Sequence, residues 1–309
     1  MGVHHSHSHS HTHSSAHDHH QELNKAFIIA IVLNLAYTVF QAIYAILANS
    51  MSLLADAAHN FGDVLGLVLA LMANLLLMVP ARKRYSYGFK RTTIIAALAN
   101  AFILVATSAF ILLESINKLL HLSAINSTIV IWAGLLGIVI NAGSSFLFMR
   151  DRHADLNVQG AFLHLISDAL ISLGVVIGAI CIRYTNWYWI DPILSILIVA
   201  IILWGTIGLL RDSINLILDG VPRYVDQAGV MRYLQELPGV TSVHDLHIWG
   251  LSTREVALTA HLIMPDSNLS DDDFHHINHE LHERFRINHA TLQVEKGTDS
   301  DPCGRAVIC

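Results

Sequence analysis

Six long apolar stretches limit what this chain can fold into. A helix needs about 20 apolar residues to cross a bilayer. We expect membrane spans at Phe27–Ala48, Leu53–Val79, Ile94–Leu113, Ile125–Met149, Ala161–Ile182 and Trp189–Leu210. Of the 309 residues, 53% are hydrophobic and only 14% are charged, whereas about a quarter of the residues of a soluble protein are charged. The sequence predicts a polytopic α-helical membrane protein, which contacts lipid and has no nucleic-acid partner.

The basic residues orient the predicted spans. They gather after the second, fourth and sixth spans, at Arg82, Lys83, Arg84, Lys90, Arg91, Arg150, Arg152 and Arg211. The other loops hold little positive charge, with Lys118 and Arg183 at their edges. Loops rich in Lys and Arg stay in the cytoplasm, so both termini are expected there. The sequence shows no secretory signal, and we expect an integral protein of a bacterial inner membrane.

A polar C-terminal region follows the last span. Helical periodicity predicts a helix at Arg223–Glu236, and Pro238 and Gly239 end it. Two strands are expected at Val240–Trp249 and Glu255–Met264, then a helix from Asp271 to about Arg286, and a strand at Thr291–Glu295. The order αββαβ is typical of a ferredoxin-like α+β domain. We therefore expect a histidine-rich tail at 1–22, a membrane domain at 23–212 and a cytoplasmic domain at 213–309.

Two histidine–aspartate pairs lie inside the predicted spans. His59 and Asp63 are four residues apart in the second span, and His164 and Asp168 repeat this spacing in the fifth. Four residues is about one helical turn, so each pair lies on one face of its helix. Two imidazoles and two carboxylates form a ligand set that suits tetrahedral zinc. Ionisable groups are costly in a membrane span and usually functional, so the pairs predict an ion site.

Other polar residues allow more than one interpretation. Asp56 could accept a hydrogen bond from a ligand histidine or cap the start of the second span. In the C-terminal domain, His244, His261 and Glu295 could form a zinc site across three strands. Strict alternation would put His244, Leu246 and Ile248 on one face of the first strand. The alternative is that these are ordinary surface residues.

Several histidines and cysteines have the weakest signals. The histidines between His4 and His20 form a serine-rich tract that could capture metal or be dispensable. His275, His276 and His279 have helical spacing, which favours a solvated helix face with incidental metal affinity. Cys303 and Cys309 form no CxxC motif. A separate hypothesis pairs Arg91, in the loop after the second span, with Asp219 at the entry to the C-terminal domain.

Three segments resemble the cation diffusion facilitator family of zinc transporters. They are LLADAAHNFGD (Leu53–Asp63), HLISD (His164–Asp168) and VHDLHIW (Val243–Trp249). The resemblance covers about residues 21–296. It implies a homodimer that exchanges cytosolic Zn2+ for H+. It also implies that the four membrane residues form the transport site and that His244, His261 and Glu295 bind metal in the cytoplasmic domain. An extra site known in some members is not expected, because Arg82, Tyr85 and Phe89 occupy its positions.

Two other functions compete with metal efflux. An intramembrane metalloenzyme needs a general base and an open ligand position, but the chain has no HExxH motif and no spare glutamate near the quartet. A non-transporting metal sensor leaves the ligands within the membrane unexplained. We therefore expect a transporter and not an enzyme. Its substrate is Zn2+, and Cd2+, Co2+ or Ni2+ remain open because all accept imidazole and carboxylate ligands.

Overall fold

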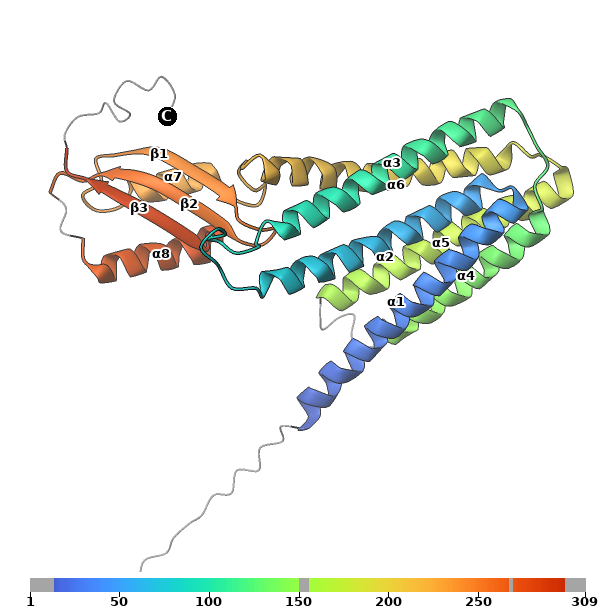
Figure 1. Ribbon diagram of the computed structural model, residues 1–309, viewed down its shortest axis with the longest axis horizontal. Coiled ribbons are helices and arrows are strands. Elements are labelled where there is room, and N and C mark those ends of the chain that lie inside the picture. The colour runs from blue at the N-terminus through green and yellow to red at the C-terminus, as the bar shows by residue number, and fades with distance from the viewer. Residues whose placement is uncertain (1–13, 150–155, 267–268, 298–309) are drawn as a thin grey trace, which may run out of the picture. The chain divides into compact units, whose positions relative to one another are not determined.

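The computed structural model describes residues 14–149, 156–266 and 269–297. Six long helices come first (Figure 1). They are α1 (Ser14–Ala48), α2 (Met51–Leu77), α3 (Thr92–Leu120), α4 (Ser127–Phe148), α5 (Leu156–Thr185) and α6 (Ile190–Ile217). The elements α7 (Gln227–Gln235), β1 (Ser242–Gly250), β2 (Val256–Ile263), α8 (Asp271–Phe285) and β3 (His289–Glu295) follow. The predicted order is confirmed.

All six predicted spans are helices long and apolar enough to cross a membrane. Large apolar side chains stay exposed along them, such as Trp204 at 88% and Phe102 at 67%, as expected of surfaces that face lipid. Several helices extend beyond the predicted spans, among them α3, which continues past Leu113 to Leu120. The first helix begins at Ser14 and so includes residues 14–22 of the expected tail, and α6 continues past Leu210 to Ile217. None of these extensions contains a glycine or proline that would stop the helix.

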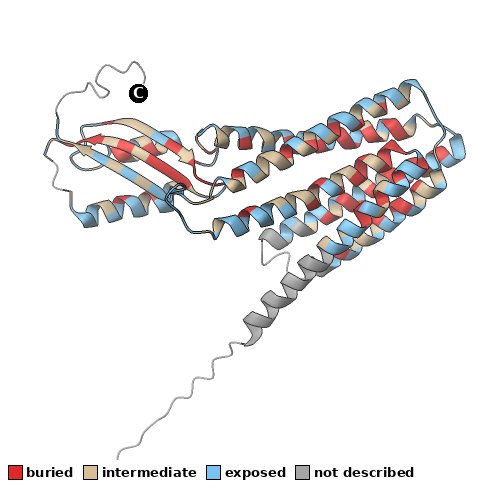
Figure 2. Ribbon diagram, viewed as in Figure 1, coloured by how far each residue is buried: buried red, intermediate tan, exposed pale blue. Residues whose placement is uncertain are grey.

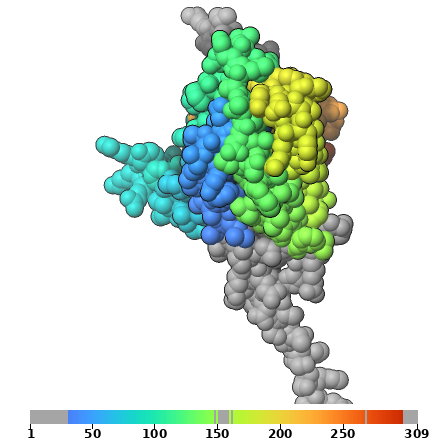
Figure 3. Space-filling view, turned by 90° about the vertical axis from the view of Figure 1, so that its right-hand side faces the viewer, coloured from blue at the N-terminus to red at the C-terminus, as the bar shows by residue number. Residues whose placement is uncertain are grey.

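By packing, the described chain forms two compact units. Of the described residues, the first contains 14–64, 106–149 and 156–202, and the second contains 65–105, 203–266 and 269–297. In the first unit, α4 packs against both α1 and α5, and Figure 3 shows side chains of α1 (blue) and α4 (green) in contact. Glycines on α4 permit this approach. A Cβ at Gly134 would lie 2.5 Å from Val176 Cγ2, and one at Gly137 would lie 2.1 Å from Tyr37 Oη.

The start of α2 is held by a residue distant in sequence. Asp191, in the first turn of α6, is 1% exposed. Its carboxylate accepts hydrogen bonds from Met51 N at 2.7 Å and Ser52 N at 3.3 Å. The hydroxyls of Ser50 and Ser52 donate to it at 2.6 Å and 2.5 Å. Asp191 thus caps α2 in trans, because the first N–H groups of a helix have no partner within the helix.

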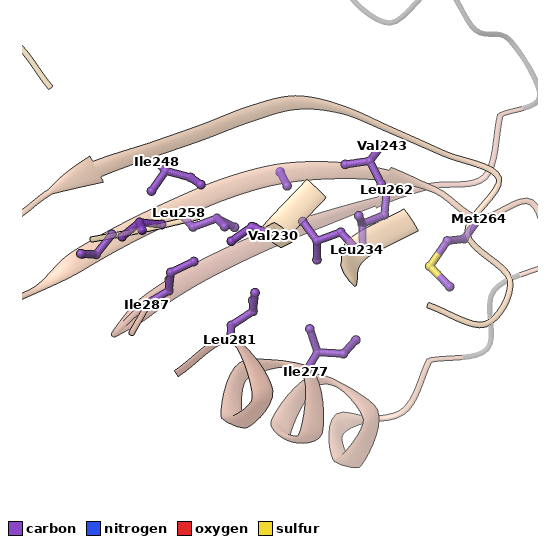
Figure 4. Packing of buried hydrophobic residues seen from close by; sticks show 13 residues of the cluster. Val230, Leu234, Val243, Ile248, Leu258, Leu262, Met264, Ile277, Leu281 and Ile287 are labelled. Carbon is purple, nitrogen blue, oxygen red and sulfur yellow. The ribbon is translucent and has the colours of Figure 1, made fainter. Parts of the chain in front are cut away.

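The soluble part of the second unit is a three-stranded sheet with two helices. The strand order is β1-β2-β3; β1 and β2 are antiparallel, and β2 and β3 are parallel. The central strand β2 is largely buried (Figure 2). Its inward side chains meet those of both helices in a hydrophobic core (Figure 4). That core includes Val230 and Leu234 of α7, Leu258 and Leu262 of β2, and Ile277 and Leu281 of α8.

The strict alternation expected of β1 was wrong. Val243 and Ile248 both point into the core, although they are five positions apart. The register shifts between His244 and His247, and Asp245 has a φ of 52°. A β-bulge inserts an extra residue and reverses the alternation beyond it. His244 and Ile248 therefore face opposite sides of the sheet.

Candidate metal sites

The two histidine–aspartate pairs meet between α2 and α5. His59 Nε2 lies 3.4 Å from Asp168 Oδ1, and His164 Nε2 lies 3.4 Å from Asp63 Oδ2. Within the helices, His164 Nε2 is 3.5 Å from Asp168 Oδ2 and His59 Nδ1 is 3.7 Å from Asp63 Oδ2. Each histidine therefore contacts the carboxylate of its own helix and that of the other helix. The structure brings together all four residues that the sequence singled out.

The two separations between the helices, both 3.4 Å, suit a shared cation better than direct hydrogen bonds. They exceed the usual 2.7–3.2 Å of a hydrogen bond. Zinc bonds of about 2.0–2.1 Å in a tetrahedron put neighbouring ligand atoms about 3.3 Å apart. His59, Asp63 and Asp168 each place a ligand atom within 4.8 Å of the other two. The buried oxygens of Asp63 and Asp168 also include atoms without a hydrogen-bond donor among the described residues, so the arrangement fits a divalent cation.

The four side chains differ in access. Asp168 is 1% exposed, His59 19%, Asp63 24% and His164 44%. In the described part of the chain, neither carboxylate pairs with a lysine or arginine, so no basic side chain there competes with a cation for them. The exposure decreases in the order His164, Asp63, His59, Asp168, so the Asp168 carboxylate is the least accessible of the four groups.

Asp56 takes neither of the two roles that the sequence left open. It lies inside α2, and the cap of that helix is Asp191. Its Oδ2 accepts hydrogen bonds from Gln41 Nε2 of α1 at 2.6 Å and from Ser172 Oγ of α5 at 2.9 Å. Asn60 Nδ2 in turn donates to Gln41 Oε1 at 3.0 Å. These contacts join three helices in a buried polar layer one turn from His59.

The cytoplasmic domain gathers the second predicted set. His244 and His261 are opposite each other on β1 and β2, and their rings are 5.0 Å apart. Glu295, on β3, lies 3.2 Å from His244 Nε2 and 3.0 Å from His261 Nδ1. The three ligand atoms are mutually within 4.8 Å. Two imidazoles and one carboxylate fit zinc and leave a fourth position open.

The charge of Glu295 supports this fit. Burial raises its pKa, but hydrogen bonds from Gln293 and His244 and the nearby His244 and His261 together outweigh burial and hold the pKa below its usual range. The carboxylate is therefore ionised at neutral pH, as a metal ligand must be. Asp245, at the bulge, lies 3.5 Å from His261 Nε2 and was missed from sequence. Only the bulge brings it there.

The weaker candidates remain apart from these clusters. His275, His276 and His279 are exposed on α8 and join no group of ligand atoms among the described residues. Cys303, Cys309 and the histidines before Ser14 lie outside the described residues. Their metal binding stays a prediction.

The loop between α2 and α3 contacts the soluble part of its own unit. Arg91 Nη2 forms an ion pair with Asp219 Oδ1, as hypothesised, and both side chains are 52% exposed. Lys90 pairs with Glu255, which was not predicted. Thr253 N donates to Thr93 Oγ1 at 3.1 Å. Three contacts therefore join this loop and the first turn of α3 to the soluble domain.

Comparison with known proteins identifies the family. Residues 27–218 match the cation efflux transmembrane domain, and residues 222–297 match the cation efflux protein cytoplasmic domain. The chain is 32% identical to the cadmium, cobalt and zinc/H(+)-K(+) antiporter of Bacillus subtilis (strain 168), over 95% of each chain. It is 35% identical to the metal cation efflux system protein CzcD of Cupriavidus metallidurans, over 94% of this chain and 91% of the relative.

A third relative is the zinc transporter ZitB of Escherichia coli (strain K12), which is 33% identical over 84% of this chain and 83% of its own length. The relatives are covered along most of their length, and the matched families span both parts of the chain. The chain therefore belongs to the cation efflux, or cation diffusion facilitator, family, as an integral membrane transporter with a cytoplasmic C-terminal domain and not an enzyme.

Proposed function

We propose that this protein exports Zn2+ from the cytosol in exchange for H+, through the quartet His59, Asp63, His164 and Asp168. The observation that carries the proposal is the pair of 3.4 Å N–O separations between α2 and α5, from His59 Nε2 to Asp168 Oδ1 and from His164 Nε2 to Asp63 Oδ2. Four ligands from two elements can be brought together or drawn apart by a small change in helix packing. That is the property an alternating-access site requires.

Protons and metal compete for the same atoms. Zinc binds neutral imidazole and ionised carboxylate, so binding releases protons from the ligands. With the site open to the cytoplasm, Zn2+ binds; with the site open outward, protons on His59 and His164 displace it. The protonated site then returns. An inward proton gradient thus drives metal outward.

The imidazole–carboxylate set favours Zn2+, and it also accepts Cd2+ and Co2+. The names of these relatives include all three metals. We therefore infer a transporter of zinc and chemically similar divalent cations, in a bacterial inner membrane.

The cytoplasmic site has a regulatory role in this proposal. Zinc on His244, His261 and Glu295 ties the three strands together and draws the cytoplasmic domains of two subunits toward each other in a homodimer. The match to a cytoplasmic domain family supports the homodimer. Small-angle scattering of the detergent-solubilised protein tests this step, because equal domain separation with and without zinc would contradict it.

Metal flux in reconstituted vesicles tests the transport proposal. Wild-type protein should move Zn2+ toward the side of higher proton concentration, measured with a zinc-sensitive dye. Asp168→Ala should abolish this flux. Ser167→Ala is the matched control, because Ser167 Oγ donates only to Leu163 O at 2.9 Å in its own helix. Flux that survives in Asp168→Ala, or that ignores the pH gradient, would refute the proposal.

A further inference from the structure

The described residues include two fully buried aspartates outside the quartet, and their surroundings differ. Asp191 is 1% exposed and accepts four hydrogen bonds, two of them from backbone N–H groups at a helix N-terminus. Such donors stabilise a carboxylate charge. Asp56 is 0% exposed, and both of its donors, Gln41 and Ser172, are neutral side chains that bind one oxygen. Its other oxygen, Oδ1, is buried and has no donor among the described residues.

A carboxylate in this environment is poorly compensated. Burying a charge without a cation or a full set of hydrogen bonds is costly, and a carboxyl group avoids that cost by binding a proton. The titratable groups near Asp56 come from three helices: Tyr37 of α1, His59 of α2 and Asp168 of α5. The segment Ser127–Phe148 of α4 has no charged residue. Of these groups only His59 can offer positive charge, and it does so only when it is protonated.

Asp56 is also placed next to the transport site. It precedes His59 by about one turn of α2, and its partner Ser172 follows Asp168 by about one turn of α5. The C-terminal domain is cytoplasmic and six spans precede it, so α2 runs from the outer face inward. The layer formed by Asp56 and Ser172 therefore lies on the outer side of the quartet, where protons arrive.

We propose that Asp56 is an additional proton-carrying group of the transport cycle. It holds a proton while the quartet is empty and releases that proton when a divalent cation binds. The carboxylic acid releases H+ to the cytoplasmic side and becomes a carboxylate as the cation enters, and it regains H+ from the outer side as the cation leaves. Electrostatics supply the coupling: without a cation and with neutral histidines the quartet is negative and favours a neutral Asp56, whereas a bound divalent cation offsets that charge and permits an ionised Asp56. This inference rests on the proposed antiport.

Two measurements test the inference. The first is the ratio of protons to zinc ions moved in vesicles, with both fluxes followed in parallel. Asp56→Asn preserves the shape of the protonated acid, and it should lower the ratio by about one proton per ion while zinc flux persists. Asp191→Asn, the other fully buried aspartate, should leave the ratio unchanged. An unchanged ratio in Asp56→Asn overturns the inference, whereas absence of zinc flux in the wild type overturns the antiport itself.

The second measurement is an infrared difference spectrum of the full chain in lipid, with and without Zn2+. The wild type should lose a protonated carboxylic acid band when zinc binds, and Asp56→Asn should lack that band. Ser172→Ala removes one hydrogen bond to Asp56 and should shift the band without abolishing it. The Ser172→Ala measurement still tests the inference if Asp56→Asn folds poorly. A band that zinc does not change, or one that Ser172→Ala does not shift, overturns the inference.

Discussion

Reversing the charge of Arg91 should slow metal transport, and reversing Asp219 as well should restore most of the rate. Arg91 lies in the loop between α2 and α3, and Asp219 lies after α6, at the entry to the cytoplasmic domain. The pair joins the loop to that domain within one compact unit. If the ion pair is broken and remade during the transport cycle, the free energy of the pair sets an upper limit on how much its loss can change the transport rate.

The exposure of the pair fixes the size of that limit. Both side chains are 52% exposed, and exposed ion pairs contribute about 0.2–1 kcal/mol. Arg91→Ala should therefore change the rate by no more than about fivefold. Arg91→Asp adds repulsion of similar size, so its effect can reach about 2 kcal/mol, or about 30-fold. Lys90 and Glu255, which are 35% and 36% exposed, remain as a second link.

The assay is initial zinc flux in proteoliposomes for wild type, Arg91→Asp, Asp219→Arg and the double variant. Each change in rate is converted to a free energy. The effect of the double variant minus the sum of the two single-variant effects gives the coupling free energy of the pair. Raising the ionic strength should shrink it, because salt screens exposed charges. Arg84→Asp is the control, since Arg84 shares the loop but forms no ion pair in the described part of the chain. A double variant as slow as Arg91→Asp, with no dependence on salt, would refute the reasoning.

Three further predictions concern stability. Gly137→Ala should destabilise the membrane bundle by about 1–3 kcal/mol, because the new Cβ would lie 2.1 Å from the buried Tyr37 Oη; thermal unfolding in detergent measures this, and an unchanged midpoint contradicts it. Leu281→Ala should cost about 2–5 kcal/mol, since Leu281 is 0% exposed in the core of the cytoplasmic domain, and faster hydrogen exchange in β2 reports the loss. Ser270→Ala should speed exchange at the start of α8 by removing the capping box. Hydrogen bonds from Ser270 N and Oγ hold the pKa of Asp273 below its usual range. The cap should therefore stabilise α8 fully when the pH is above the ordinary pKa of an aspartate. This stabilisation should be lost as the pH falls through the lowered pKa of Asp273.

The sequence alone determined the features that depend on local spacing. The six spans follow from the length of apolar runs, and the αββαβ order follows from alternating periodicities and turn residues. The quartet was predictable because a spacing of four residues puts His59 and Asp63 on one helix face, and His164 and Asp168 on another. Each pair can be recognised from the sequence of its own helix, without knowing which other helix packs against it.

Only the tertiary structure decided which partners the isolated polar residues have. Asp191 caps α2 from another helix, and a bulge at Asp245 reverses the alternation that strict pairing predicted for β1. Asp56 was ambiguous in sequence because its role depends on Gln41 of α1 and Ser172 of α5, fifteen and 116 residues away. Hydrogen bonds and burial are set by whichever side chains packing brings within reach, and no spacing along one segment specifies contacts of that range.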